Sequence, residues 1–325
     1  MFSGPYIAGI DGGASKTVAL LADRNGTILG RGKGGPSNYH NIGTEAASAA
    51  IKNALKRAKA DAGIREKIEI AVVALAAVDS EHDLRVASYF VKNAKIARMS
   101  IVIHDSVAAL YAVTKGSPGI VVNSGTGSFA AGINSKGEYA RAGGWGYILG
   151  DEGSAYDIGL RAIKMTFRSF DGREKTTELI GLLNKRFHIK SVDDLVSRIY
   201  GNGLTVEQIA AIAPLVIRAT RYDRISKEIM NDAGVELGEL VCAVASRLKM
   251  TRQGFPVAAV GGNFRSGSDL LRSLKSRVKK CSPNARITLS HVDPALGSLS
   301  IALETLSRKT NMGEASKVLI GSRGN

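Results

Sequence analysis

One pattern of strands and glycine-rich loops occurs twice in this chain, with Gly125 standing about 112 residues after Gly13. In each copy an apolar strand ends at a polar, glycine-rich loop, a second apolar strand follows, and a turn leads to a third strand. The expected strands are 6–10, 17–22 and 27–30 in the first copy and 120–123, 129–133 and 138–141 in the second. This period is far longer than the roughly 20–50 residues of solenoid repeats. The pattern therefore predicts two related halves.

Helices and further strands follow each three-stranded unit. In the first half, apolar spacing predicts helices over 45–62, 84–94 and 107–113, with strands at 68–76 and 100–104. The second half is expected to contain helices over 154–170 and within 175–248, strands at 257–260 and 286–291, and a last helix over 295–306. The polar tail beyond Ser307 is expected to fray. This order is typical of an α/β fold.

Length and hydropathy agree with two globular domains. At about 150 residues per domain, 325 residues favour two. No apolar run reaches the roughly 18 residues that a membrane span needs. The first residues lack a basic region followed by an apolar core, so no secretory signal is visible and we expect a cytoplasmic protein without a membrane partner.

The cysteine and histidine content excludes several kinds of site. Two cysteines rule out a disulfide scaffold and every four-cysteine zinc pattern, and Cys242 and Cys281 are expected to be buried, inert thiols. The five histidines show no metal-ligand spacing. No Gly-x-Ser-x-Gly motif is present, which argues against an α/β-hydrolase.

The chain carries 44 basic and 29 acidic residues, a net charge of +15. Such an excess is compatible with a nucleic-acid partner or with polyanionic small molecules such as nucleotides. The basic residues are scattered, and the aromatic residues are not interleaved with them as a stacking surface would require. We therefore expect a solvated basic surface and no nucleic-acid partner.

The first glycine-rich loop, Asp11–Thr17, resembles a P-loop only superficially. A P-loop has Gly directly before the Lys and another Gly five residues earlier, whereas this chain has Ser15 and Ile10 at those positions. The loop also joins two strands. Its backbone N–H groups at Gly12 and Gly13, the hydroxyls of Ser15 and Thr17 and the cation of Lys16 are candidates for binding a polyphosphate, with an ordinary hairpin turn as the alternative.

Two more glycine-rich loops strengthen the nucleotide interpretation. Gly125, Thr126 and Gly127 occupy the equivalent place in the second copy. A third glycine turn, Gly261-Gly262, follows the strand at 257–260 and would let a base and ribose approach the backbone. Each loop is weak alone, but the ordered set of three predicts an ATP site.

These loops resemble the motifs of the sugar kinase, heat-shock chaperone and actin superfamily, and most closely those of the N-acetylglucosamine kinase and BadF/BadG/BcrA/BcrD ATPase group. The motifs are Asp11–Thr17, Gly35–His40, His104–Ser106, Asn123–Ser128, Gly143–Gly146, Gly150–Ala155, Ala259–Phe264 and Pro294–Gly297. The resemblance implies two ribonuclease-H-like (actin-like ATPase) lobes with ATP and sugar in the cleft between them. It places the first lobe at 1–114, with a C-terminal helix 295–325 returning to it, and the second at 115–294.

The resemblance also implies roles for individual residues. Asp105 is similar to the general base that takes the sugar hydroxyl proton, with a helix N-cap as the alternative. Asp11 is similar to the residue that holds Mg²⁺ through water. The implied sugar contacts are Asn38, Asp79, Asp105, Gly144, Trp145 and Asp151, and for Asp151 a helix N-cap is again the alternative.

The expected activity is that of an ATP- and Mg²⁺-dependent sugar kinase, with a homodimer as the implied assembly. N-acetylglucosamine or glucose is the favoured substrate, and 2-keto-3-deoxygluconate, an acidic sugar, is the alternative. A function from another class is an ATPase switch or regulator that phosphorylates no sugar. Some relatives are activating ATPases with an iron–sulfur cluster held near the second phosphate motif, but 123–128 has no cysteine near it.

Overall fold

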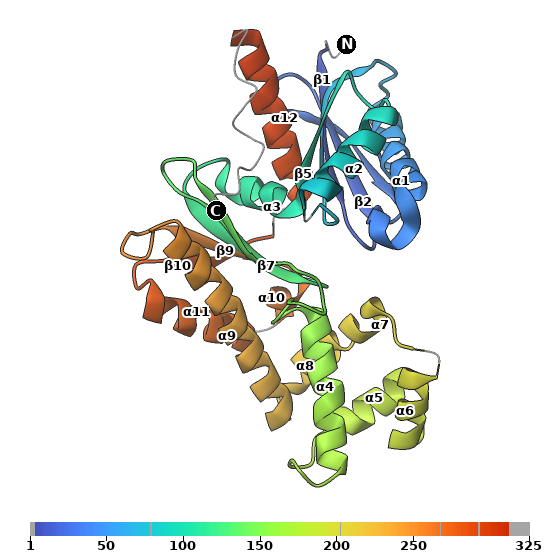
Figure 1. Cartoon of the computed structure of the whole chain (residues 1–325), viewed down its shortest axis with the longest axis vertical. Helices are drawn as coiled ribbons and strands as arrows, with labels where there is room; N and C mark the ends of the chain where they lie inside the picture. The colour runs from blue at the N-terminus through green and yellow to red at the C-terminus, as the bar shows by residue number, and fades with distance from the viewer. Residues whose placement is uncertain (1–3, 79, 202, 267, 292, 312–325) are drawn as a thin grey trace. The chain divides into compact units, whose positions relative to one another are not determined.

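The computed structural model describes residues 4–78, 80–201, 203–266, 268–291 and 293–311 (Figure 1). These residues form two compact units. The first unit comprises the described residues of Met1–Ser117 and Val292–Asn325, and the second comprises those of Pro118–His291. Each unit is built around its own sheet of five strands.

The sheet of the first unit has the order β3-β2-β1-β4-β5. Its strands are β1 (Tyr6–Gly12), β2 (Thr17–Ala22), β3 (Ile28–Gly34), β4 (Ile68–Leu75) and β5 (Met99–His104). The first three strands form an antiparallel meander, and β4 and β5 run parallel to β1. The sequence predicts three consecutive strands followed by alternating helices and strands, and the structure adds the parallel pairing of β1, β4 and β5.

Helices cover both faces of this sheet. α1 (Tyr39–Asp61) and α2 (Glu81–Asn93) share one apolar core with residues such as Ile10 and Val73. α3 (Asp105–Thr114) and α12 (Pro294–Asn311) share the other with alternate residues such as Ile7 and Val72. Because both faces are buried, the inner strands β1, β2 and β4 are almost continuously apolar.

The C-terminal helix α12 packs directly against β1 and α3. A Cβ built on Gly9 would lie 2.3 Å from the backbone nitrogen of Leu299, and one built on Gly297 would lie 1.8 Å from the carbonyl oxygen of Ala108. Glycine at both positions therefore lets the backbones touch. The helix continues to Asn311, so the described residues beyond Ser307 are helical rather than frayed.

Three helices start two or more residues earlier than the sequence predicts, and one of them, α2, begins at Glu81 rather than 84 because Ser80 caps it. α1 begins at Tyr39 because the side chain of Asn38 accepts a hydrogen bond from the His40 N–H, and the helix then kinks at Gly43, where φ is +80°. The predicted helix over 45–62 is the part after this kink. α3 begins at Asp105 rather than 107, since His104 caps it.

The sheet of the second unit repeats the first, strand for strand. Its strands are β6 (Gly119–Ser124), β7 (Ser128–Ile133), β8 (Tyr139–Gly143), β9 (Pro256–Val260) and β10 (Arg286–Leu289), in the order β10-β9-β6-β7-β8. Here β6, β7 and β8 are the antiparallel meander, and β9 and β10 run parallel to β6. The prediction of two related α/β lobes is confirmed.

The second unit carries more helices than the first. They are α4 (Ala155–Phe170), α5 (Leu179–Phe187), α6 (Val192–Tyr200), α7 (Val206–Ala210), α8 (Ala213–Ala219), α9 (Arg224–Arg247), α10 (Gly262–Ser266) and α11 (Ser268–Cys281). One large apolar core joins the sheet to most of them. The helices of the part of the chain that the structure describes include none long and apolar enough to cross a membrane.

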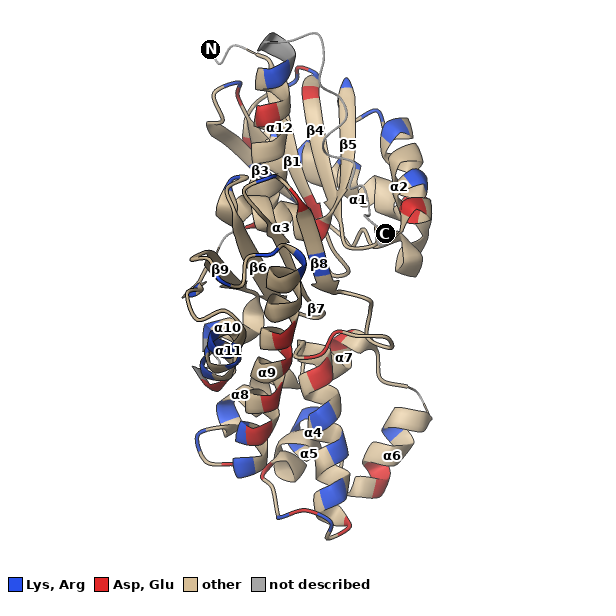
Figure 2. Ribbon diagram, turned by 60° about the vertical axis from the view of Figure 1, so that its left-hand side comes forward, with Lys and Arg blue, Asp and Glu red and all other residues tan. Residues whose placement is uncertain are grey.

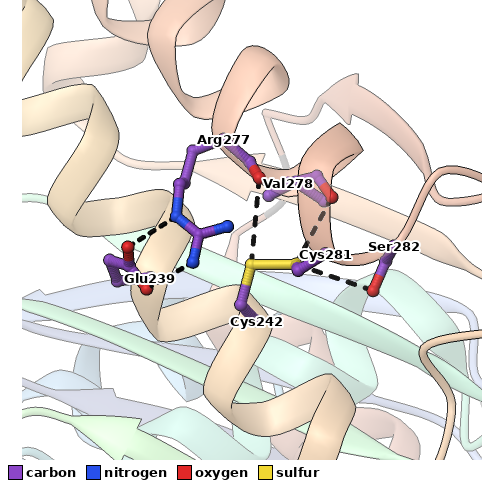
Figure 3. Close-up of polar contacts among 6 residues, drawn as sticks. All are labelled: Glu239, Cys242, Arg277, Val278, Cys281 and Ser282. Atoms are coloured by element: carbon purple, nitrogen blue, oxygen red, sulfur yellow. Dashed lines mark hydrogen bonds and ion pairs between the residues drawn. A yellow bond between two sulfur atoms is a disulfide. The ribbon is translucent and has the colours of Figure 1, made fainter.

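Cys242 on α9 and Cys281 at the end of α11 form a disulfide (Figure 3). The expectation of two inert thiols is wrong, because α9 and α11 pack so closely that the two Cα atoms are 6.0 Å apart. Glycine permits this approach: a Cβ on Gly234 would lie 2.4 Å from the carbonyl oxygen of Leu270. The guanidinium of Arg277 also binds both carboxylate oxygens of Glu239, at 2.5 and 2.8 Å.

We predict that breaking this disulfide lowers the free energy of unfolding without unfolding the protein. A crosslink across a sequence separation of 39 residues lowers the conformational entropy of the unfolded chain. In the chain-entropy model this stabilises the folded state by about 3–4 kcal/mol. We expect the reduced protein to stay folded, because the close packing of α9 on α11 does not depend on the disulfide. Urea unfolding with and without a thiol reductant measures the difference in the free energy of unfolding. The double variant Cys242→Ser, Cys281→Ser is the control and should not respond to reductant. Equal stability of the oxidised and reduced wild type would contradict the prediction.

Candidate active site

The turn between β1 and β2 presents polar groups at the end of the central strand of the first unit. The N–H of Gly13 donates to the carbonyl of Lys16 at 3.0 Å and closes the turn. Ser15 and Lys16 are exposed at its tip. A Cβ on Gly12 would lie 2.3 Å from the Ser37 hydroxyl, so only glycine fits there. The turn can therefore offer backbone N–H groups and one cation to an anion.

Thr17 lies differently from its prediction as a phosphate ligand. Its side chain is fully buried, and its hydroxyl donates to the Gly35 carbonyl at 2.8 Å and lies 2.9 Å from the Ser37 hydroxyl. The N–H of Ser37 in turn donates to the Gly13 carbonyl at 3.0 Å. Thr17 thus holds the turn against the segment after β3 instead of offering its hydroxyl to a ligand.

Three carboxylates influence one another at this edge of the first sheet. Burial, together with the nearby negative charges of Asp105 and Asp293, raises the pKa of Asp11 to about 7, and the cation of Lys16 opposes this shift. Asp293 caps α12 by accepting from the Ala295 N–H at 3.1 Å and pairs with Arg31 at 2.5 Å. Sequence reasoning missed Asp293, although Asp before Pro294 is a helix-start signal.

This set of carboxylates suits a cation held through water better than one held directly. Within the described ranges, no group of three His, Cys, Asp or Glu side chains is close enough to bind a metal ion. The repulsion that raises the pKa of Asp11 would be relieved by a nearby positive charge. Mg²⁺ prefers oxygen ligands and keeps several waters, so the donors at this site fit it.

Asp105 stands at the carboxyl end of β5, as the first residue of α3. The alternative that Asp105 caps this helix is wrong, because the imidazole Nδ1 of His104 accepts from the Ser106 N–H at 3.0 Å and forms the cap. The same Nδ1 lies 3.0 Å from Oδ1 of Asp105, whose side chain is 26% exposed. Asp105 therefore keeps a solvent-reachable carboxylate at the same edge of the sheet as Asp11.

The other sugar-contact candidate described in the first unit lies after β3. Asn38 is partly buried, and its carbonyl oxygen accepts from the His40 N–H at 3.1 Å. This cap fixes the side chain at the start of α1. Asp79 lies outside the described residues.

In the second unit, the loop at 125–127 is supported from behind by Asp151. Oδ1 of Asp151 accepts from the Ser128 N–H at 3.0 Å, and a Cβ on Gly127 would lie 3.0 Å from both carboxylate oxygens. The alternative that Asp151 caps α4 is wrong, since Ser154 does so. Gly125 and Gly127 close the loop through an N–H to carbonyl bond of 3.0 Å, and Thr126 is exposed at its tip.

The remaining candidates lie after β8 and β9. Trp145 is 53% exposed, and the guanidinium of Arg141 lies 4.8 Å from its ring centre. Gly144 precedes it with φ at +72°, a conformation that favours glycine. Gly261 follows β9 with φ at +111°, and nothing lies within 4 Å of a Cβ built on Gly262. The structure thus brings Gly125–Gly127, Asp151 and Gly261 together in one unit, and Asp11, Lys16 and Asp105 in the other.

The excess positive charge is spread over both units. Figure 2 shows Lys and Arg on helices throughout the molecule, interspersed with Asp and Glu, with a concentration on α11. That helix carries Arg272, Lys275, Arg277, Lys279 and Lys280. The net charge of +15 is therefore not confined to the loops described above.

The chain is similar to one known protein family and to curated sugar kinases. The model of the BadF/BadG/BcrA/BcrD ATPase family matches residues 8–302. An N-acetylmuramic acid/N-acetylglucosamine kinase of Clostridium acetobutylicum is 32% identical over 91% of this chain and 98% of its own length. An N-acetyl-D-glucosamine kinase of Dictyostelium discoideum is 31% identical over 91% of this chain and 97% of its own length.

Solved structures share the fold. A candidate N-acetylglucosamine kinase from Chromobacterium violaceum is 27% identical, covers 92% of this chain and 99% of its own, and superposes with a TM-score of 0.74. A ROK family glucokinase from Streptomyces griseus, crystallised with glucose and AMPPNP, is 16% identical over 91% of this chain and 98% of its own, with a TM-score of 0.58. The second likeness concerns the fold alone.

We predict that Asp11 destabilises the protein above neutral pH. The folded state keeps the Asp11 proton up to about pH 7, whereas the unfolded chain releases it near 3.8, so the contribution of this residue falls as pH rises between the two. Between pH 3.8 and pH 7 the free energy of unfolding loses at most about 4 kcal/mol through this residue. Without nucleotide or Mg²⁺, Asp11→Asn should therefore be more stable than wild type at pH 8, and this gain should shrink at pH 5. Urea unfolding at both pH values measures it.

The exposed Asp193 on α6 provides a matched control for that measurement. Asp193→Asn should leave the pH dependence of stability as it is in the wild type. A wild type and an Asp11→Asn variant with parallel pH profiles would contradict the prediction.

Proposed function

The chain belongs to the BadF/BadG/BcrA/BcrD ATPase family, and we propose that it is an ATP-dependent kinase that phosphorylates a hydroxyl of N-acetylglucosamine. The observation that carries the proposal is the near full-length match to two curated kinases of N-acetyl sugars at 31–32% identity. It puts N-acetylglucosamine ahead of glucose and of 2-keto-3-deoxygluconate. The name of the first relative makes N-acetylmuramic acid the second substrate to test.

The loops supply the binding of the phosphates. Phosphoryl transfer requires positioning and charge neutralisation more than covalent chemistry from the protein. We assign the phosphates to the loops at 12–17 and 125–127 and to the cation of Lys16, and the nucleoside to Gly261 and Gly262. Asp11 would hold Mg²⁺ through water, and the bound ion supplies positive charge to the phosphates.

Asp105 is the proposed general base. Its carboxylate accepts the proton of the attacking sugar hydroxyl as the oxygen bonds to phosphorus. Nδ1 of His104 lies 3.0 Å from this carboxylate.

Sugar recognition draws on both units in this proposal. Asn38 and Asp105 belong to the first unit, while Asp151 and the Gly144-Trp145 segment belong to the second. Short polar side chains suit ring hydroxyls, which both donate and accept, and the exposed indole of Trp145 offers an apolar face. Asp79 remains a further expected contact.

Three finer expectations accompany the proposal. We place the reaction in the cytoplasm, where ATP is available, we name Mg²⁺ as the divalent cation, and we expect a homodimer. Metal replacement in the kinase assay tests the second, and light scattering in solution tests the third.

The decisive test is a coupled ADP-release assay over a panel of sugars. N-acetylglucosamine, N-acetylmuramic acid, glucose and 2-keto-3-deoxygluconate are each supplied with ATP, and the product is identified by mass spectrometry. A phosphorylated sugar supports the kinase, with the best substrate having the highest kcat/KM. ATP hydrolysis to free phosphate with every sugar would instead indicate an ATPase switch.

We predict that Asp105→Asn lowers kcat about 100-fold or more, because the amide cannot accept the proton and a general base contributes about 10²–10⁴. Sugar affinity should change far less, since the amide still hydrogen-bonds a hydroxyl. Steady-state kinetics and calorimetric sugar binding measure the two effects. Asp193→Asn, which also removes a carboxylate from the first turn of a helix, is the matched control. An Asp105→Asn variant that keeps more than about a tenth of wild-type kcat would place the base elsewhere.

We predict that Gly127→Val raises the KM for ATP by at least about tenfold. A side chain at 127 collides with Asp151, which is 9% exposed and holds the Ser128 N–H, so the loop must move. Gly181→Val is the control, because a Cβ on Gly181 meets nothing within 4 Å. A folded Gly127→Val protein with an unchanged KM for ATP would remove this loop from the nucleotide site.

A further inference from the structure

Two buried polar side chains of the second unit connect the loops that follow two neighbouring strands. Ser124 is the last residue of β6, and Asn263 lies in α10, directly after Gly261-Gly262. β6 and β9 run parallel, with Asn123 opposite Val260, so the loops that leave them begin side by side at one edge of the sheet. Ser124 is fully buried and Asn263 is 5% exposed.

The Ser124 hydroxyl joins three segments through hydrogen bonds in series. Nδ2 of Asn263 donates to Oγ of Ser124 at 2.9 Å, and the Ser124 hydroxyl donates to the Gly153 carbonyl at 2.7 Å. The Asn263 amide also lies 3.5 Å from the Gly125 carbonyl. Bonds in series strengthen one another in a buried setting. The loop at 125–127, the turn at Gly261-Gly262 and the segment before α4 are therefore tied at one atom.

The backbones of these segments are also in contact. A Cβ on Gly261 would lie 2.2 Å from the Ser124 carbonyl oxygen, and φ is +111° there. The carbonyl of Gly125 accepts from the Ala155 N–H at 2.8 Å, which fixes the loop to the start of α4. No side chain fits between the two loops at Gly261, so their backbones lie in contact there.

The contacts made by Asn263 lie where the strand ladder no longer holds the chain. The last paired residues of β6 and β9 are Asn123 and Val260. Ser124 and Asn263 come after that pair, beyond the end of the β6–β9 ladder. Their hydrogen bond therefore fixes the relative position of the loops, which the ladder alone leaves unset.

We propose that Asn263 and Ser124 are positioning residues that fix the distance between the phosphate-binding loop and the nucleoside-binding turn. This inference rests on the proposed function, which assigns the phosphates to 125–127 and the nucleoside to Gly261-Gly262. ATP has to contact both loops at once, so its affinity depends on their separation. Adenosine fills only the turn, and inorganic tripolyphosphate fills only the phosphate loops, so neither depends on it.

The test compares these three ligands on Asn263→Ala and Ser124→Ala in the full-length protein with Mg²⁺. Calorimetry, with competition for the weaker ligands, gives each dissociation constant. The ATP affinity should fall at least about tenfold, as expected for the loss of a buried hydrogen bond, whereas the affinities for adenosine and tripolyphosphate should change less than about threefold. The two variants remove the same bond from opposite sides, so either one suffices if the other does not fold.

A second Asn–Ser bond in the same unit provides the matched control. The Ser273 hydroxyl on α11 donates to Oδ1 of Asn231 on α9 at 3.0 Å, between two partly buried side chains. Asn231→Ala removes a similar bond without touching either loop. It should leave all three affinities within about twofold of wild type.

Two results would overturn the inference. Wild-type ATP affinity in both variants would show that the loops keep their spacing without this bond. An equal loss for ATP, adenosine and tripolyphosphate would show a general structural role. If the wild-type protein binds no ATP, the proposed function is refuted, and the inference with it. If the wild-type protein phosphorylates a sugar and both variants bind ATP as tightly as it does, the inference alone is refuted.

Discussion

The central strand of each sheet pairs antiparallel on one side and parallel on the other, and the rest of each unit depends on this mixed pairing. β1 lies between β2 and β4, and β6 lies between β7 and β9. The tight turn to the antiparallel neighbour is thereby placed beside the loop that leaves the parallel neighbour. In the second unit this brings 125–127 next to Gly261. In the first it sets Asp11 at the same sheet edge as Asp105.

Close backbone contact is the second condition for these sites. Glycine allows it because it has no side chain. Gly12 packs under Ser37, Gly127 against Asp151 and Gly261 on Ser124, each at a distance that leaves no room for a Cβ to fit freely. Glycine costs stability in a strand or a helix, because it loses more conformational freedom on folding. Its use at these positions is explained by the geometry of the loops, since a side chain would force the loop away from its support.

The strand and loop pattern was predictable from the sequence because it depends on local signals. Alternating apolar runs and glycine turns defined β1, β2, β6 and β7 to within a few residues. The role of Thr17 was not predictable, because the sequence does not show whether a hydroxyl beside a phosphate-type loop points to solvent or donates to the Gly35 carbonyl. Asp105 as base, Asp11 as metal residue and the sugar contacts came from resemblance, and they stay predictions.

Contacts between residues far apart in the chain could not be predicted from the sequence, for a physical reason. Cys242 and Cys281 meet only because α9 and α11 pack together, which glycines at 234 and 238 permit. Asn263 and Ser124 are 139 positions apart, and their bond follows from the pairing of β9 with β6. Asp293 reaches the vicinity of Asp11 only because α12 returns to the first sheet. In each case tertiary packing, which no local pattern encodes, creates the contact.

The electrostatics of Asp11 lower the stability of the folded protein at neutral pH. Asp11 is a partly buried carboxylate whose pKa is raised to about 7 by desolvation and by two other carboxylates, and its charged form is unfavourable in the folded protein at neutral pH. Asparagine would fill the same space without the charge. Retaining the acid is costly unless a cation binds there, and Lys16 alone does not restore the ordinary pKa. Under the proposed function, Mg²⁺ bound with the nucleotide would supply the positive charge that offsets this cost, because each carboxylate would attract the ion.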